Sequence, residues 1–147
     1  MSGTTTQLRH VVYVSRRAPG LTDHQVVDGI VLPSMTRNRR LNLSGCIWFD
    51  HGSFFQVLEG PADDLTRVFG AIERDGRHHS LRVLSAQEID HRDFERFSMR
   101  LIAEETPDAV RQIIEQYDAD STAPSPATAQ PAIVIRRLIS EISAKFV

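Results

Sequence analysis

Ser53-Phe54-Phe55-Gln56-Val57-Leu58-Glu59-Gly60 is the stretch that decides the fold. Its aromatic and β-branched residues favour a strand, bounded by turn residues at 50–52 and by Gly60-Pro61. Side chains alternate between the two faces of a strand, so Gln56 shares one face with Phe54 and Leu58, and the other face carries Phe55, Val57 and Glu59. A buried Gln56 must satisfy two donors and an acceptor, through a backbone group at a sheet edge or through some other partner.

The pattern on either side of this strand predicts alternating strands and helices. Thr22 and Gln25 form a capping box at the start of the first helix, which Pro33 should kink or restart. Gly76 is expected to end the second helix in a left-handed conformation. In chain order we expect a strand over 8–15, a helix from 23, a strand over 43–50, the Gln56 strand, a helix over 62–75, a strand over 81–89 and a short strand over 97–102.

This order predicts an α+β fold, a ferredoxin-like βαββαβ(β) antiparallel sheet with two helices on one face. We assign it to residues 1–103. Residues 104–147 are expected to form a helical extension with a Ser/Thr/Pro/Ala linker over 118–131. Its last helix carries an apolar stripe, which should cover the bare sheet face or a partner's equivalent surface: Ile135, Leu138, Ile139, Ile142 and Phe146.

Composition excludes several classes of protein. The chain has 147 residues, 41% of them apolar and 24% charged, which suits one packed domain. A net charge of −2 argues against a nucleic-acid binder or a polybasic membrane binder. Cys46 is the only cysteine, so an internal disulfide cannot form. No apolar run approaches membrane-spanning length, and a cytoplasmic protein is expected.

Three polar side chains stand in apolar surroundings, namely Tyr13, Asn38 and Gln56. The topology would bring them to a pocket between the two helices, above the sheet. The sequence shows no carboxylate pair, no Ser–His–Asp order and no metal-ligand spacing, which disfavours an enzyme. The adjacent pair His78-His79 is expected in a solvated turn. The basic run 37–40 is expected to form a solvated face, or to meet a phosphate.

From Leu8 to Leu101 the chain resembles the BLUF domain, the flavin-binding blue-light sensor of bacteria. Several independent pieces carry the resemblance, in the right order and spacing. They are Val-Val-Tyr13-Val-Ser, Leu21-Thr22, Arg37-Asn38 followed by Leu43-Ser44-Gly45, Gly52-Ser-Phe-Phe-Gln56-Val-Leu-Glu-Gly60-Pro61, Asp75-Gly-Arg77-His78-His79, Arg92-Asp-Phe94 and Phe97-Ser98-Met99.

The resemblance implies FAD as a chromophore and a role for each matching residue. Tyr13 matches the photoactive tyrosine, which donates an electron to the excited flavin and then loses a proton. Gln56 matches the glutamine that bridges this tyrosine and the ring edge, and whose amide rearranges in the light. Asn38 matches the asparagine that holds the same ring edge, and Met99 matches the methionine that relays the change to the fifth strand.

The resemblance also implies the rest of the flavin site. Arg37 occupies a position that borders the flavin and varies in residue type. The remaining positions are the tail-side residues Asp75, Arg77 and His78, and the apolar walls Ile30 and Ile72.

Two departures from the family pattern stand out. Phe97 replaces a common Trp, so relay through an indole is impossible there and Met99 becomes the expected relay. Asn42-Leu43-Ser44-Gly45 replaces the usual Gly-Ile-Thr-Gly, and Asn42 should tolerate a left-handed backbone. Trp48 is expected to pack on the sheet; competing electron donation to the flavin is the alternative.

We therefore expect a short photoreceptor with FAD, no effector domain and no enzymatic activity. Its signal would pass to a separate regulator protein, from a homodimer or larger homo-oligomer built partly on the last helix. Neither nucleic acid nor membrane is an expected partner. Two other readings stay open: a flavin-free ferredoxin-like interaction module, and a small flavin- or nucleotide-dependent enzyme.

Overall fold

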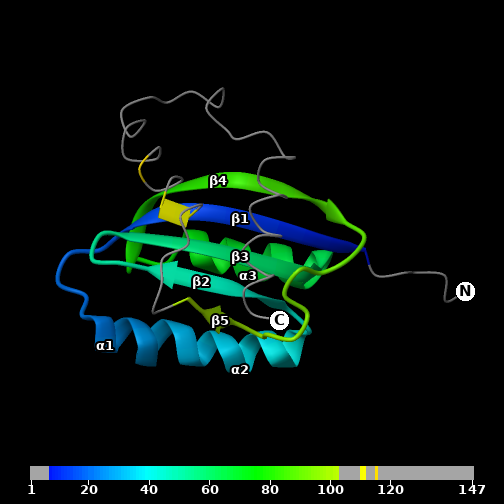
Figure 1. Cartoon of the computed structure of the whole chain (residues 1–147), viewed down its shortest axis with the longest axis horizontal. Coiled ribbons are helices and arrows are strands. Elements are labelled where there is room, and N and C mark those ends of the chain that lie inside the picture. Colours follow the sequence, from blue (N-terminus) through cyan, green and yellow to red (C-terminus); the bar gives the residue numbers. More distant parts are fainter. Residues whose placement is uncertain (1–6, 103–109, 112–114, 116–147) are drawn as a thin grey trace, which may run out of the picture.

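A five-stranded sheet is the centre of the molecule, with helices against one face (Figure 1). This computed structural model describes residues 7–102, 110, 111 and 115. The strands lie in the order β4-β1-β3-β2-β5. Their bounds are β1 Leu8–Arg17, β2 Ser44–Phe49, β3 Ser53–Pro61, β4 His78–Ile89 and β5 Arg100–Leu101.

The predicted ferredoxin-like arrangement is confirmed, with two corrections to the sheet. β5 pairs with β2 in parallel, so the sheet is mixed rather than antiparallel. β5 also has only two residues, whereas a strand over 97–102 was predicted. The preceding residues instead form a loop that hydrogen bonds to the sheet, with the N–H of Gly45 donating to the carbonyl of Phe97 at 3.0 Å.

The first helical arm runs through three pieces, α1 Asp23–Val26, the π-helical η1 Val27–Val31 and α2 Leu32–Leu41. The predicted capping box of Thr22 and Gln25 is present. Pro33 accounts for the irregular middle, because it has no N–H to donate to the carbonyl of Gly29, one α-helical turn earlier. That carbonyl accepts a hydrogen bond from Arg77 Nη1 at 2.7 Å instead. The predicted disturbance at Pro33 is thus present as a π segment that precedes it.

Asn42 ends α2 in the left-handed conformation, at φ 59° and ψ 37°. The prediction that this residue preserves the turn is therefore confirmed. Gly45, three residues later, is the second residue of β2. A Cβ atom there would lie 1.9 Å from the carbonyl oxygen of Val57, so only glycine lets β2 approach β3 so closely.

The second helix, α3 Ala62–Glu73, begins with Asp63 and Asp64, whose charges suit the positive end of the helix dipole. The prediction that Gly76 ends this helix in a left-handed conformation is wrong. Among the described residues the positive-φ glycines are Gly20, Gly45 and Gly60, and the α3 cap is Arg74 in a right-handed conformation.

Strands β2 and β3 form the predicted tight hairpin. Asp50 Oδ1 accepts hydrogen bonds from the N–H groups of Gly52 and Ser53, at 2.8 and 2.7 Å. This side chain fixes the turn and so the register, which places Gln56 opposite Ile47 on one side and Tyr13 on the other.

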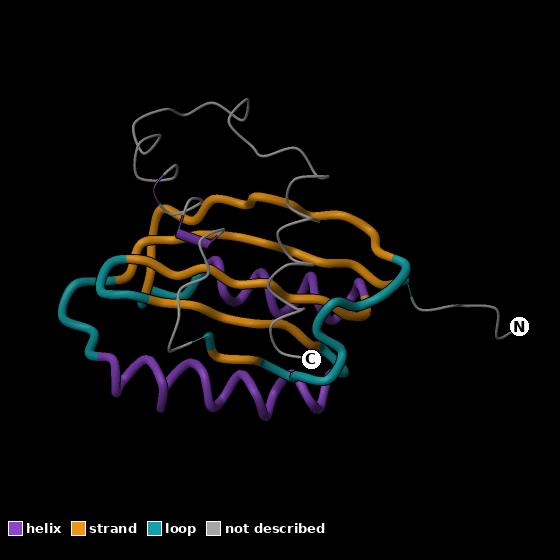
Figure 2. Tube along the Cα trace, viewed as in Figure 1, coloured by secondary structure: helices purple, strands orange, loops and turns teal. Residues whose placement is uncertain are grey.

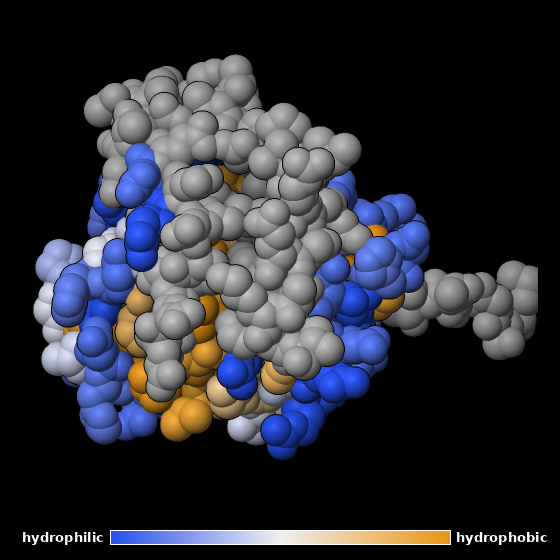
Figure 3. Space-filling model, in the orientation of Figure 1, coloured by the Kyte–Doolittle hydropathy of each residue, from blue (hydrophilic) through white to orange (hydrophobic). Residues whose placement is uncertain are grey.

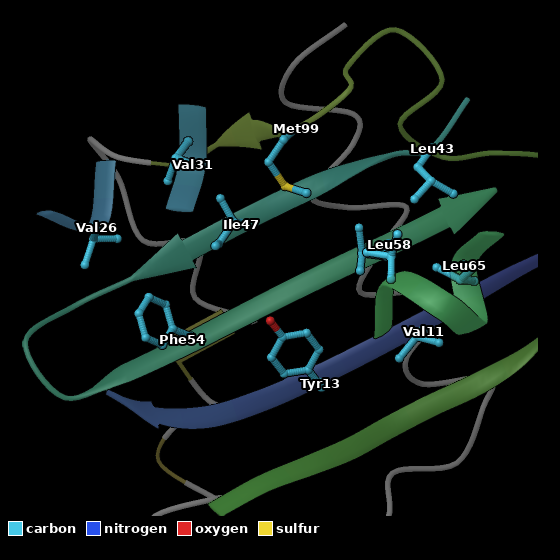
Figure 4. Packing of buried hydrophobic residues seen from close by; sticks show 11 residues of the cluster. Val11, Tyr13, Val26, Val31, Leu43, Ile47, Phe54, Leu58, Leu65 and Met99 are labelled. Carbon is cyan, nitrogen blue, oxygen red and sulfur yellow. The ribbon is translucent and has the colours of Figure 1, made fainter. Parts of the chain in front are cut away.

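Each face of the sheet carries its own apolar cluster. Figures 2 and 4 show the helices and the buried side chains of the first face, where Tyr13, Phe54 and Leu58 pack against residues of both helical arms. The expected placement of both helices on one face is confirmed. On the opposite face, Val12, Trp48 and Phe55 pack with Phe94, Ile102 and Val110. Trp48 is thus a sheet-packing aromatic, as expected.

Those last three residues cover part of the face that was expected to be bare. The predicted helix with the stripe Ile135 to Phe146 and the linker 118–131 lie outside the described residues. On the view in Figure 3, apolar side chains gather in one area, and hydrophilic side chains dominate the rest of the visible described surface. Within the described part of the chain, no helix is long and apolar enough to cross a membrane.

Candidate functional site

A cavity of about 350 Å³ lies between the two helical arms, over the sheet. Its position is the predicted one. Eight predicted site residues line it, namely Tyr13, Ile30, Arg37, Gln56, Ile72, Asp75, Arg77 and His78. The other two predicted site residues, Asn38 and the relay residue Met99, do not line it. Because the lining comes from β1, β2, β3, β4 and both arms, the fold itself brings together residues that are up to 65 positions apart, from Tyr13 to His78.

Gln56 connects two of the predicted residues. Tyr13 lies opposite it in the β1–β3 register, and the Tyr13 hydroxyl donates a hydrogen bond to Gln56 Oε1. Gln56 Nε2 donates to the sulfur of Met99 at 3.7 Å. All three side chains are buried, with 3% of each residue exposed. Both ends of one amide thus have partners on different strands, and Figure 4 shows the Tyr13 hydroxyl pointing across β3 toward the side that holds Met99.

Tyr13 keeps its proton in this setting. Burial raises the pKa of its phenol well above the ordinary value, Asp75 raises it further, and the charge of Arg37 opposes both. The same burial lowers the pKa of Arg37 while the interaction with Tyr13 raises it. The site therefore holds a neutral phenol beside a cation, with Gln56 as the acceptor of its hydrogen bond.

Asn38 lies next to the cavity and is fully buried. Its Oδ1 accepts from Arg37 Nε and Nη2 at 3.1 and 2.9 Å, and its Nδ2 donates to the carbonyl of Ser98 at 2.8 Å. Asn38 thus links α2 to the residue before Met99. Its side chain reaches the β5 lead-in segment rather than the cavity surface.

Arg77 closes one side of the cavity. Its guanidinium forms a bidentate pair with Asp75, with Nη2 at 2.6 Å from Oδ2 and Nε at 2.9 Å from Oδ1. Nη1 reaches the carbonyl of Gly29 on η1, across the gap between the arms. These hydrogen bonds to Arg77 lower the pKa of Asp75. Arg77 therefore ties the α3–β4 turn to the first arm.

The pair His78-His79 was expected in a solvated turn, and that expectation is wrong, because both residues lie in β4. His79 is exposed, whereas His78 lines the cavity. His78 Nε2 donates to the carbonyl of Ile72 at 2.6 Å, and Nδ1 accepts from the Ser15 hydroxyl at 2.7 Å. Its ring meets those of Tyr13 and Phe54 edge-on, at centroid distances of 6.1 and 6.2 Å. Strand β4 begins at His78, three residues earlier than predicted, which brings this ring into the cavity wall.

The model of the family described as "Sensors of blue-light using FAD" matches residues 8–100, more than half of the chain. The chain belongs to the BLUF family. BLUF domains bind FAD or another flavin, and this chain is a BLUF blue-light sensor that uses a flavin.

Named relatives share the matching region only. Photoactivated adenylate cyclase subunit beta of Euglena gracilis is 33% identical over 85 residues, which is 57% of this chain and 10% of that protein. The blue light- and temperature-regulated antirepressor BluF of Escherichia coli is 29% identical over 75 residues, 51% of this chain and 19% of that protein. The chain thus spans a fifth or less of the length of either relative.

Solved structures share the fold. BlrB, a BLUF protein in its dark state, has a TM-score of 0.71 at 23% identity, over 97% of this chain and 99% of that one. BlsA in a photo-activated state has a TM-score of 0.71 at 22% identity, over 92% and 94%. Both matches agree with the BLUF fold of the described residues.

The cavity suits a flavin ring. Its volume lies within the range typical of small-molecule pockets, and apolar side chains from both arms and from the sheet line it, such as Ile30, Ile72 and Ile47. Polar groups that could meet a heteroaromatic edge converge at one side, where Gln56 and Arg37 lie. Within the described residues, no cluster of three or more metal-ligating side chains occurs.

Sequence reasoning missed six lining residues: Gly29, Pro33, Ser34, Arg40, Ile47 and Phe54. Two signals could have found most of them. Pro33, Ser34 and Arg40 follow Ile30 and Arg37 at helical spacing, and Ile47 lies directly opposite Gln56 in the β2–β3 register. Phe54 was predicted to pack beside Gln56 and does so, though it was not assigned to the flavin.

Proposed function

We propose that this protein is a photoreceptor that binds FAD in the cavity and signals by rearrangement of the Tyr13–Gln56 hydrogen-bond network. One observation carries the proposal: the Gln56 amide has one partner at each end, Tyr13 and Met99. An amide accepts at its oxygen and donates at its nitrogen, so turning it exchanges the two functions between the two sides. Such a group has two arrangements of similar energy, as a sensor requires.

The residues that would hold the flavin ring fall into an apolar group and a polar group. Ile30 and Ile72 would supply apolar walls from the two arms, while Arg37 and Gln56 would face polar atoms of the ring. Arg77, Asp75 and His78 would border the tail side. We assign Asn38 to the site through Arg37 and Ser98, since both ends of its amide are occupied by these two residues.

When bound, the flavin absorbs blue light and can accept an electron in its excited state. Tyr13 is the donor in this proposal, because its buried phenol lies on the cavity surface. Its proton is held in a hydrogen bond to Gln56 Oε1, so that oxygen is the nearest acceptor when the proton leaves. The amide that receives the proton, or turns in response, changes what it presents to Met99.

Three contacts would carry that change to β5. Gly45 donates to the carbonyl of Phe97, Asn38 to the carbonyl of Ser98, and Gln56 to the sulfur of Met99. Consecutive residues are therefore tied to β2, α2 and β3. A change at Gln56 therefore acts on Met99, which is the last of these three residues and lies directly before β5.

We propose that the signal passes through the region after β5 to a separate regulator protein. A homodimer or larger homo-oligomer built on the helix predicted over 135–146 would form part of that output. No reaction on a substrate is proposed. Of the cavity groups that could act as an acid or a base, Asp75 is paired with Arg77, and both ring nitrogens of His78 are hydrogen bonded, to Ser15 and to the carbonyl of Ile72.

Absorption spectroscopy of the full chain, purified and supplied with FAD, separates the candidate functions. The proposal predicts a yellow protein with one flavin per chain and a red-shifted spectrum in blue light that reverts in the dark. A protein that remains colourless after reconstitution would be the flavin-free interaction module. A bound flavin that is bleached by added substrates rather than shifted by light would indicate a flavin enzyme.

A further inference from the structure

Glu59 is a fully buried carboxyl on the sheet face opposite the cavity. It lies on β3, three residues after Gln56, and its alternation places it with Phe55 and Val57. Three donors converge on it. Ser44 Oγ lies 3.0 Å from Oε1, the N–H of Phe94 donates to Oε1 at 2.6 Å, and the N–H of Asp93 donates to Oε2 at 2.9 Å.

Two of those donors belong to the segment that leads to Met99. From Phe94 the attachments continue along the chain, since the N–H of Phe97 donates to the carbonyl of Phe94 at 2.9 Å. The carbonyl of Phe97 in turn accepts from Gly45 at 3.0 Å. Phe94 itself is buried, with 1% exposed, in the cluster on this face. Strand β3 thus holds the segment twice, through Glu59 at Phe94 and through Gln56 at Met99.

Arg92 reinforces the first attachment from the same segment. Its Nη1 donates to Ser44 Oγ at 2.9 Å and its Nη2 to the carbonyl of Asn42 at 2.7 Å. Ser44 therefore accepts from Arg92 while it donates to Glu59. The Glu59 carboxyl is linked in this way to both β2 and the loop before β5.

Burial raises the pKa of Glu59, and the hydrogen bonds from its three donors oppose that shift by favouring a carboxylate. An ionised carboxyl is acceptor-only at both oxygens and can serve Ser44, Asp93 and Phe94 together. An amide of the same shape would turn an NH₂ group toward at least one N–H or O–H donor. The other polar or ionisable groups about Glu59 are His10 opposite it on β1, Cys46 on β2, and Arg92 and Asp93 on the loop.

We propose that Glu59 is a positioning residue for the light-sensing site, which sets the place of Met99 beside Gln56 by anchoring the backbone of Asp93 and Phe94. The effect of Glu59 on the light response rests on the proposed function. The placement of Met99 by Glu59 is a property of the dark protein. Glu59 touches neither the cavity nor Gln56 and acts through the six residues from Phe94 to Met99.

Methionine-methyl NMR of the full chain with FAD tests the structural part without photochemistry. The chain has three methionines, and a Met99→Leu variant identifies the Met99 signal. Glu59→Gln should shift or broaden that signal in the dark and leave Met35 in place. Ser85→Ala is the matched control. It removes a hydroxyl on the same sheet face that hydrogen bonds to His10 at 2.8 Å rather than to the loop. An unmoved Met99 signal in a folded Glu59→Gln protein overturns the proposal.

A double-mutant cycle tests the functional part. Glu59→Gln alone should change the dark-recovery rate by about threefold or more, a size usual for residues coupled in one network. In the Met99→Leu background the same substitution should change the rate much less, because the residue through which Glu59 acts is gone. Equal effects in both backgrounds would show that Glu59 acts on overall stability alone, and would overturn the proposal.

Failure of the two proposals can be told apart. If the wild-type protein binds FAD but shows no reversible red shift, the proposed function fails, while the NMR result still decides the place of Glu59. If Glu59→Gln does not fold, Ser44→Ala serves instead, since it removes one donor to Glu59 and the acceptor of Arg92. That variant should move the Met99 signal in the same direction, and a signal identical to wild type would contradict the anchor.

Discussion

Gln56 donates its side-chain N–H to the sulfur of Met99 at 3.7 Å while its oxygen accepts from the Tyr13 hydroxyl. The Tyr13–Gln56 contact is between β1 and β3, and the Gln56–Met99 contact is between β3 and the residue before β5. One side chain of β3 therefore joins β1 to the residue directly before β5.

Met99→Leu should keep the volume of the side chain but remove the acceptor of the Gln56 N–H. We expect the free energy of unfolding to fall by about 1 kcal/mol, the usual cost of one buried hydrogen bond. We also expect the dark-recovery rate to change, because the dark arrangement of Gln56 loses a partner. Urea denaturation and flash spectroscopy measure the two. A variant with both values at the wild-type level would show that the sulfur contact has no energetic role.

Tyr13→Phe should change how stability depends on alkaline pH. Burial raises the pKa of Tyr13 in the folded protein above its ordinary value of 10.0. Its contribution to stability is therefore complete below about pH 10 and is lost as the pH rises further, because only the unfolded chain ionises readily there. The wild-type protein should lose stability more steeply than Tyr13→Phe above that pH. Parallel curves from urea denaturation would argue against a buried, neutral phenol.

Gly45→Ala should destabilise the fold strongly. A Cβ atom at Gly45 would lie 1.9 Å from the carbonyl oxygen of Val57, which is backbone and cannot move aside cheaply. We expect a loss of roughly 3 kcal/mol or more, as for severe overpacking. Gly52→Ala is the matched control, because a Cβ atom there meets nothing within 4 Å. Thermal and urea denaturation of both variants should separate them clearly. Equal free energies of unfolding for the two variants would mean that β2 and β3 can move apart without loss of stability.

Arg77→Ala should weaken flavin retention. The substitution removes the link to Gly29 across the gap between the arms and leaves Asp75 without its main partner. We expect a Kd for FAD about tenfold higher, in line with the loss of one charge-assisted hydrogen bond. Arg74→Ala removes an exposed arginine at the end of α3 and serves as the control. Fluorescence titration measures both, and equal values for the two variants would contradict the assignment of Arg77 to the site.

Much of this architecture could be predicted from local pattern. The alternation in β1 and β3 placed Tyr13 and Gln56 on the helix-covered face, and the capping box located the start of the first arm. Resemblance to the BLUF family then assigned eight residues that line the cavity. These predictions succeeded because strand alternation and turn chemistry depend on neighbouring residues in the chain.

Contacts between distant segments explain the features of the fold and the site that the sequence did not predict. The parallel pairing of β5 and its short length follow from a loop held by side chains such as Glu59, which no local pattern reveals. The inward place of His78 follows from an earlier start of β4, where partners on Ser15 and Ile72 replace solvent. Asn38 was assigned to the flavin edge, yet its amide serves Arg37 and Ser98, a choice that depends on where β5 lies.

The central claim is that the Gln56 amide is the switch, and light-minus-dark absorption spectroscopy of wild type and Gln56→Leu tests it most directly. Leucine keeps the apolar packing with Phe54 and Leu58 but has no group for Tyr13 or Met99. The account predicts that both proteins bind FAD and that only the wild type shows a reversible red shift in blue light. A Gln56→Leu protein that still shows the wild-type shift and recovery would contradict it.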